Sequence, residues 1–447
     1  MRKLGFGVLA IIAVAGIYYF ASGSAQITKE MKEQVNNELV NLKENGFAIS
    51  EREIKESQEH FVLDFNDSTK IASFLSTQGI QAKSDDLTIL KGMKIGVDLK
   101  YLDSAKNALS ADLYPLSLPN QITKDISADN KQALLRIEKM LKEKSILIHV
   151  DFNKLLSGFT AYVKDINETF EGVEKIQILA KGMNFEGDIE NKKLKHIKKD
   201  IEQIELRVSN ELNIKFLSIK GNHALLGPSP YDTSLDYSIK NIELKTNQST
   251  ALDIKNIISK TRTSATDSLL NSKTKTSIEE INMQHEANKY KILNTDFNVE
   301  VDNLNARALE KLQKVDSNDK KEIKKLLKEM LEKGIKISIS SLSSKSVVEN
   351  GSKLGGFSVN ASARIDNSLD IDASMENPLM ALQAVLVNSR LTLSSKLFSL
   401  AASDPKAMIF LMFFPPHEEK TKSGETLKVF DINFTKGSLS INGVAMF

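Results

Sequence analysis

The side chains of this 447-residue chain that could do chemistry include its histidines, serines and carboxylates. The chain contains no Cys. That absence excludes disulfides, thiolate metal sites and cysteine nucleophiles. The six histidines are His60, His149, His196, His223, His285 and His417. No two of them have the HxH or i,i+4 spacing of a metal-binding pair, and His285-Glu286 lacks the second His of a zinc-protease motif. We therefore expect no metal site built on histidine.

Two short segments resemble parts of active sites but are better explained as ordinary structure. Gly227-Pro228-Ser229-Pro230 has the outline of a serine elbow, although its flanking prolines favour a turn. Asp370 and Asp372 would share the polar face of a strand, where solvated carboxylates are more common than a cation site. His149 is opposite in phase to its apolar strand neighbours, so we expect it to face solvent. No catalytic residue, metal or cofactor is expected.

The composition is that of an ordinary globular protein and argues against a nucleic-acid binder. Hydrophobic residues make up 41% of the sequence and charged residues 26%. Lys plus Arg number 60 and Asp plus Glu 58, so the net charge is +2, whereas nucleic-acid-binding domains are usually strongly basic. Arginines, whose guanidinium groups recognise phosphate well, are also few. No nucleic-acid partner is expected.

The first 25 residues predict a location at a membrane. Met1-Arg2-Lys3 precede an almost wholly apolar run, residues 4–20, of about the minimum length for a transmembrane helix. The basic start orients the remaining chain away from the cytoplasm. The segment is either retained as a single-pass anchor, which the length of the run favours, or removed as a signal peptide at Gly23-Ser24-Ala25.

The secondary-structure elements that must position any functional side chains are predicted to be mainly β-strands. Alternation of apolar and polar residues predicts long antiparallel strands with one apolar face. The longest alternating run extends from Phe357 to Met375, with Asn367 as its one interruption. The Ser/Thr-rich segment 249–276 fits a strand or a loop equally well. The apolar face of such a sheet must be covered by helices, another sheet, a partner or a ligand.

A few amphipathic helices are expected between the strands. Residues 28–43 read as a helix, either a stalk or the first helix of the folded part. Residues 317–333 form another, with Ser317 or Asn318 as candidate N-cap and Gly334 just past the C-terminus.

An internal duplication is suggested by two of the helical segments. Asp129–Met140 aligns without gaps with Asp319–Met330, and each segment then runs into an alternating strand. We interpret this as a repeated unit of a helix and a hairpin. The alternative is chance similarity between two Lys/Glu/Leu-rich helices.

The segment 405–414 is hydrophobic on all sides, and Asp404-Pro405 is a typical helix start. It is either a buried helix that plugs one end of the sheet or a lid for a lipid or apolar peptide. Under the second interpretation, the candidate residues of a ligand groove are Phe357, Val359, Ala361, Ala363, Ile365, Met408, Phe410, Met412 and Phe413.

Three segments carry a resemblance to a known family. They are Gly334–Leu342, where a helix passes into a strand, Gly355–Asn360, and the closing Lys436–Gly443. The chain resembles the YdgA-like bacterial envelope family over essentially its whole length. The resemblance implies an inner-membrane-anchored periplasmic protein without an established biochemical activity, and it supplies no catalytic residues.

Sequons with an acidic residue two positions earlier occur at Asn66, Asn167 and Asn433. They resemble the acidic sequon of some bacterial N-glycosylation systems, although chance occurrence is the simpler explanation. They are candidate glycosylation sites.

Together these observations predict an α+β protein of long, curved antiparallel strands packed with a few helices. We expect an anchor or signal in residues 1–25, a helical stalk or lead-in in 26–60, a first β-rich half in 61–304 and a second in 305–447. The favoured function is a non-enzymatic, single-pass inner-membrane protein with its bulk in the periplasm, which binds lipid or another apolar ligand in a groove. The alternatives are an assembly partner in a cell-envelope protein complex, which would use an exposed sheet edge, and, less favoured, a glycan-active hydrolase with two facing carboxylates.

Overall fold

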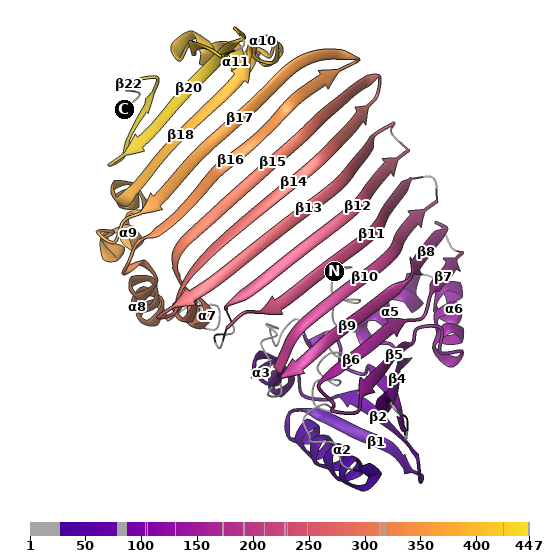
Figure 1. Cartoon of the computed structure of the whole chain (residues 1–447). Coiled ribbons are helices and arrows are strands. Elements are labelled where there is room, and N and C mark those ends of the chain that lie inside the picture. The colour runs from indigo at the N-terminus through magenta and orange to yellow at the C-terminus, as the bar shows by residue number, and fades with distance from the viewer. Residues whose placement is uncertain are drawn as a thin grey trace. The chain divides into compact units, whose positions relative to one another are not determined.

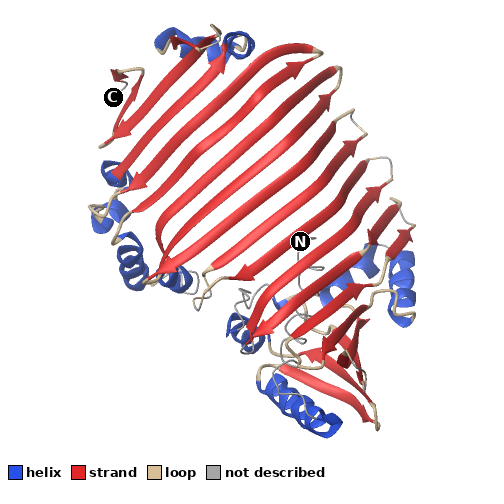
Figure 2. Ribbon diagram, in the orientation of Figure 1, coloured by secondary structure: helices blue, strands red, loops and turns tan. Residues whose placement is uncertain are grey.

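The computed structural model describes residues 27–445 except 78–86, 103, 105, 130, 172–173, 191–192, 210, 228, 230, 248, 313–314, 316–318 and 423. The predicted membrane segment, residues 4–20, lies outside this part. The chain forms two compact units, Met1–Ala224 and Leu225–Phe447. Both are built from antiparallel strands joined by short turns or by helical excursions, as Figures 1 and 2 show. The predicted α+β class is confirmed.

The sheet of the first unit runs almost in chain order. Its strands are β1 (Phe47–Ile54), β2 (Gln58–Phe65), β3 (Lys94–Tyr101), β4 (Asn107–Ser117), β5 (Ile148–Asn153), β6 (Gly158–Val163), β7 (Ile166–Phe170), β8 (Ile176–Lys181), β9 (Met183–Glu190), β10 (Lys193–Val208) and β11 (Leu212–Leu225). Strands β1 to β6 pair in succession, and β6 pairs with β9. Strands β9 and β8 pair with the two halves of β10, β7 pairs with β8, and β11 follows β10.

A conventional hydrophobic core stabilises the first unit. Helix α2 (Ile27–Glu44) contributes Val35, Leu39 and Leu42, which recur at helical spacing and are all buried. Helix α3 (Ser68–Thr77) adds further apolar side chains, and both helices pack on strand residues such as Phe61 and Phe152, which have no exposed surface. Two more helices, α5 (Asn120–Asp129) and α6 (Lys131–Lys142), join β4 to β5, and α6 contacts β4 and β7.

The second unit is a meander of longer strands. They are β12 (Thr233–Thr246), β13 (Ala251–Thr266), β14 (Leu269–His285), β15 (Asn288–Asn305), β16 (Ile335–Glu349), β17 (Ser352–Ile365), β18 (Val385–Ser394), β19 (His417–Lys420), β20 (Thr426–Thr435), β21 (Ser438–Ile441) and β22 (Val444–Ala445). Strands β12 to β18 pair in chain order and β18 pairs with β20. Strands β19 and β21 pair with the other edge of β20, and β22 pairs with β21.

The helices of the second unit are excursions between strands that are neighbours in the sheet. They are α7 (Ala306–Leu312), α8 (Lys320–Leu331), α9 (Ile371–Glu376), the 3-10 helix η1 (Pro378–Ala384), α10 (Ser395–Ala402) and α11 (Pro405–Phe413). Figure 2 shows them at the ends of the long strands. Within the described part of the chain, none of the helices is long and hydrophobic enough to cross a bilayer.

Left-handed residues interrupt alternate long strands at regular intervals. Ser218 in β11, Asn256 in β13 and Asn294 in β15 have φ of +48°, +51° and +52° and are equally spaced along the chain. Asn tolerates this conformation better than most residues because its short side chain can hydrogen-bond locally. In β13 the Asn256 amide donates to the carboxylate of Glu279 on β14.

The predicted domain boundaries differ from the division of the structure. The division at 304/305 would separate β15 from β16, which pair along most of their length; the two units instead divide between Ala224 and Leu225. The stalk predicted for residues 26–60 is instead helix α2, packed on the core, followed by β1 and the start of β2. The alternative interpretation of α2, as the first helix of the folded part, is the correct one.

The helix predicted for residues 317–333 is present as α8, with a different N-cap from those expected. Helix α8 has Asp319 as its N-cap, whose carboxylate accepts a hydrogen bond from the backbone N–H of Glu322 at 3.0 Å. Gly334 follows its C-terminus with φ +68°, as predicted. Lys144, which the proposed duplication aligns with Gly334, also has positive φ, +48°, after helix α6. The duplication itself stays a prediction.

The long alternating run ends earlier than predicted. Strand β17 stops at Ile365, and Asp370 accepts a hydrogen bond from the N–H of Ala373 at 3.0 Å to start helix α9. The alternation beyond Ile365 therefore belongs to a turn and a helix. Asp372 forms ion pairs with Lys324 and Lys328 of α8. The two ammonium groups compensate the negative charge of its carboxylate, so no bound cation is needed there.

Candidate functional site

One face of the second unit is apolar across most of its strands. Residues paired directly across strands lie on the same face of a sheet, so the strand registers define this face residue by residue. We call it the apolar face; it consists of Leu235, Tyr237, Ile239, Ile257, Ile278, Phe297, Val299, Val301, Ile337, Ile339, Leu342, Phe357, Val359, Ala361, Ala363, Ile365, Val385, Val387, Leu391, Leu393, Phe430, Ile432 and Phe434. The same registers place mainly Ser, Asn, Lys, Arg, Asp and Glu on the opposite face.

Nearly all of these side chains are partly exposed. Among them only Phe430 is buried, and Ile337 keeps 47% of its surface exposed. In the first unit, by contrast, Phe61, Val150 and Phe152 are completely buried. The strands β1 to β6 of the first unit thus bury their apolar side chains, whereas the apolar side chains of the second unit retain contact with solvent.

Helices cover the apolar face only near the two ends of its strands. At one end, Leu327, Met330 and Leu331 of α8 and Ile371 of α9 pack against the strand residues Leu304, Ile335 and Ile365. At the other end, Phe398 of α10 and Leu411 of α11 pack with Phe414 against Leu391, Phe430 and Ile432. Between these two clusters the strand residues of the apolar face stay accessible.

The predicted strand half of the ligand groove is brought together by the fold. Phe357, Val359, Ala361, Ala363 and Ile365 lie on one face of β17, paired with Leu393, Leu391, Ser389, Val387 and Val385 of β18. All five are partly exposed. The predicted alternation is therefore correct over this segment.

The predicted helical half lies at one end of the same face. Helix α11 touches the sheet through Leu411, while Met408, Met412 and Phe413 keep 54%, 77% and 68% of their surface exposed. The side chain of Phe410 lies outside the described residues. The interpretation of α11 as a buried plug is wrong, because Met408, Ile409, Met412 and Phe413 are exposed.

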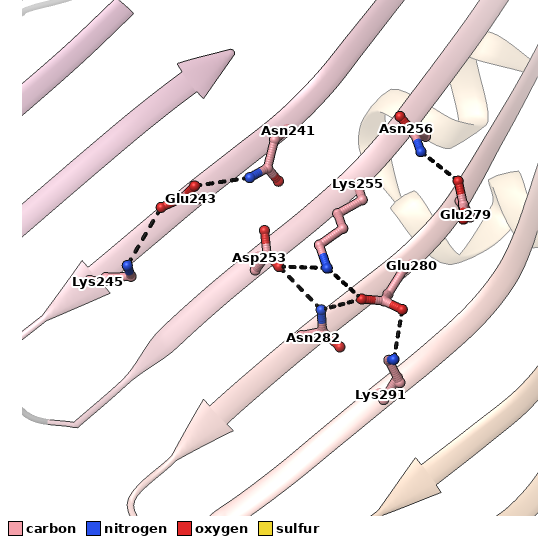
Figure 3. A network of polar contacts seen from close by, with 10 residues as sticks. All are labelled: Asn241, Glu243, Lys245, Asp253, Lys255, Asn256, Glu279, Glu280, Asn282 and Lys291. Carbon is pink, nitrogen blue, oxygen red and sulfur yellow. Dashed lines mark hydrogen bonds and ion pairs between the residues drawn. The ribbon is translucent and has the colours of Figure 1, made fainter.

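A network of charged and polar side chains lies on strands β13, β14 and β15, near the left-handed residue Asn256 (Figure 3). Glu280 accepts from Lys255 at 2.8 Å and from Lys291 at 2.7 Å, and the amide of Asn282 donates to it at 2.7 Å. These three contacts lower the pKa of Glu280 to about 2. Lys255 also lies 3.4 Å from Asp253. The network links β13, β14 and β15 through side chains and leaves no obvious reactive group.

The first unit carries a row of His and Asp side chains across four strands. His60 Nδ1 lies 2.6 Å from Asp98, and His149 Nδ1 lies 2.6 Å from Asp112. The two carboxylates are opposite each other in the pairing of β3 with β4. His149 is thus only 22% exposed and engaged by a carboxylate, so the prediction that it simply faces solvent is incomplete.

Lys144 joins this row from the turn after α6. Its Nζ lies 2.9 Å from Asp98 and 3.6 Å from the centre of the Tyr114 ring, which fits over Gly96. Burial raises the pKa of Asp98, but the hydrogen bonds from Lys144, His60 and Tyr114 outweigh it and bring the pKa below its usual value. Every member is engaged by a neighbour, which is typical of structural ion pairs. Within the described residues, no group of three His, Asp or Glu is arranged to hold a metal ion.

The three candidate glycosylation sites are accessible. Asn66 follows β2, Asn167 lies on β7 and Asn433 on β20, and all three side chains are exposed. Glycosylation stays a prediction.

The comparisons with known proteins give one family and no characterised relative. Residues 149–409 match the family model described as "Bacterial protein of unknown function (DUF945)". No curated protein and no solved structure matches the chain. The matched segment contains β6 to β18, all of β5 except Ile148, and all of the β17 groove residues.

Proposed function

The chain belongs to DUF945, a bacterial family of unknown function, and we propose that it is a non-enzymatic protein that binds the acyl chains of a lipid on its apolar face. The observation that carries the proposal is the accessibility of that face. An exposed apolar patch larger than a few hundred Å² usually marks an interaction site in a protein. The finer resemblance to the YdgA-like envelope proteins, and the location in the periplasm at the inner membrane, are parts of the same proposal.

Acyl chains suit this surface for two physical reasons. The backbone groups of the central strands are already paired within the sheet, so an occupant needs no hydrogen bonds from them. The exposed Met408 and Met412 of α11 are flexible side chains that adapt to irregular apolar shapes.

Binding of a partner by strand addition receives less support. The strand β1, which pairs only with β2 among the described strands, presents Glu51, Arg52 and Glu53 in its C-terminal half, and the φ of Glu51 is +52°. Charges and an irregularity of this kind are common devices that prevent another strand from pairing with a sheet edge.

The test is a change of one residue on each face of β17. Val359→Asp places a charge on the apolar face, and Asn360→Asp places the same charge on the opposite face one residue later. We expect purified wild type and Asn360→Asp to bind a fluorescent fatty acid such as cis-parinaric acid, and Val359→Asp to lose about tenfold or more in affinity. Equal binding by both variants, or no lipid bound by the wild type, would contradict the proposal.

A further inference from the structure

A polar pocket of about 670 Å³ lies at one end of the strands that form the apolar face. It is lined by Ser229, Tyr231, Asp267, Ser268, Arg307 and Glu310. These residues come from the loop before β12, the turn between β13 and β14, and helix α7. The pocket thus collects hydroxyl, carboxylate and guanidinium groups from three segments that are distant in sequence.

The walls of the pocket are held by hydrogen bonds. Ala306 N–H at the start of α7 donates to the Ser268 carbonyl at 2.9 Å, and Ala265 N–H donates to Asp232 at 2.7 Å. Gly227 allows the Asp232 carboxylate to approach, because a Cβ there would lie 2.4 Å from it. The described residues of this segment, Ser229 and Tyr231, lie in a bend and a turn, which agrees with the predicted turn.

The charges in the pocket are of both signs. Glu310 accepts a hydrogen bond from the Tyr231 hydroxyl, and burial together with this contact raises the pKa of Tyr231 to about 12, so the hydroxyl stays a donor at neutral pH. Arg307 is exposed, and among the described residues no carboxylate lies within ion-pair distance of it. Asp267 is also exposed. The pocket therefore offers an available cation and two acidic groups.

The pocket is continuous with the face that contains the apolar residues. Ala265 lines it and pairs directly with Leu270, which pairs with Leu304. Further along β13 and β14 the same face carries three hydroxyl pairs: Thr263 with Ser272, Thr261 with Thr274 and Ser259 with Thr276, at 2.9 to 3.0 Å. Because these hydroxyls satisfy each other, they can lie beside an apolar chain at little cost.

We propose that this pocket binds the zwitterionic headgroup of a phospholipid whose acyl chains lie on the apolar face. The phosphate lies against Arg307, and the ammonium group lies between Glu310 and Asp267. A guanidinium is the favoured partner of a phosphate, and a carboxylate that of an ammonium group. The inference rests on the proposed function and adds the class of lipid.

The test measures the headgroup preference of pocket variants. The probes are dioleoylphosphatidylethanolamine, dioleoylphosphatidylglycerol and dioleoylglycerol in detergent micelles, with binding measured by native mass spectrometry. The wild type should bind phosphatidylethanolamine about tenfold more tightly than phosphatidylglycerol, and phosphatidylglycerol about tenfold more tightly than dioleoylglycerol, since each charge-assisted hydrogen bond contributes about that much. Arg307→Gln should weaken both phospholipids equally without changing dioleoylglycerol binding, and Glu310→Gln should remove only the preference for the amine.

Arg262→Gln is the matched control, because Arg262 lies on β13 but on the opposite face, paired with Asp236. It should keep the wild-type preference. Unchanged preference in both pocket variants, while Val359→Asp abolishes lipid binding, would overturn the headgroup site and leave the proposed function intact. Binding of O-phosphoethanolamine alone as tightly as the lipid would also overturn the proposal, because the chains would then contribute nothing.

Discussion

The two units differ in how far helices cover the apolar face of the sheet. Both consist of antiparallel strands with one apolar face, but in the first unit α2 and α3 pack on strands β1 to β6 and bury side chains such as Phe61 completely. In the second unit the helices pack only at the strand ends. The alternation of apolar and polar residues in the strands specifies which face of each sheet is apolar. The placement of the helices decides whether the chain itself covers that face.

The stabilising interactions should differ accordingly. Full burial of a large apolar side chain contributes about 1.5–3 kcal/mol, and this contribution is available at many positions in the first unit. In the second unit the small clusters at the strand ends, the strand ladders and charged networks such as that around Glu280 must carry more of the stability.

Truncation of a core side chain should separate the two units most clearly. Phe61→Ala in the first unit should lower the free energy of unfolding by about 3–5 kcal/mol, because Phe61 has no exposed surface. The matched change Phe297→Ala on the apolar face should cost about 1 kcal/mol, since Phe297 is already partly in water. Urea unfolding followed by circular dichroism, with hydrogen exchange to locate each effect, measures both; equal losses would refute the contrast.

Removal of the Glu280 charge should have a smaller, pH-dependent effect. The pKa of Glu280 is about 2 in the folded protein, below its usual value of 4.5, so the carboxylate stabilises the fold above about pH 4.5 and this contribution is lost as the pH falls toward 2. Glu280→Gln should therefore cost about 1–2 kcal/mol at pH 7, after allowance for solvent screening, and almost nothing near pH 2.

Glu286→Gln, in the exposed turn between β14 and β15, is the control for this measurement. It should leave the unfolding free energy unchanged at both values of pH. A loss for Glu280→Gln that is the same at pH 7 and near pH 2 would mean that the side chain acts through packing and not through its charge.

Substitution of an exposed residue on the apolar face should have the smallest effect on stability but should still weaken ligand binding. Ile337→Ser on the apolar face should change the unfolding free energy by about 0.5 kcal/mol or less, because Ile337 is 47% exposed. It should nevertheless weaken fatty-acid binding measurably, whereas Ser338→Ala on the opposite face should not. An Ile337→Ser protein that loses stability but binds the fatty acid as tightly as the wild type would contradict this prediction.

Local patterns in the sequence predicted the elements well because their causes are local. The alternation at Phe357–Ile365 gave a strand, and Asp404-Pro405 gave the start of helix α11. The same alternation misled beyond Ile365, because the capping of α9 by Asp370 prevails over the period-two pattern there.

What the sequence could not reveal depends on contacts between distant segments. The pairing of Asp112 with His149 follows from the register of β4 with β5, and nothing near either residue signals it. The pocket at Arg307 and Tyr231 likewise joins three separate segments. Whether the apolar face is covered is decided by where the helices return to the sheet, which hydrophobic periodicity does not encode.

The order of the strands also bears on how this protein comes into being. Most strands pair with the strand that follows them in the chain, and even the helical excursions return to the neighbouring position. Contacts between near neighbours in sequence form quickly and require little loop closure. A chain organised in this way can be assembled hairpin by hairpin from its N-terminus while the rest is still being synthesised, because each new hairpin can pair with a strand that has already formed.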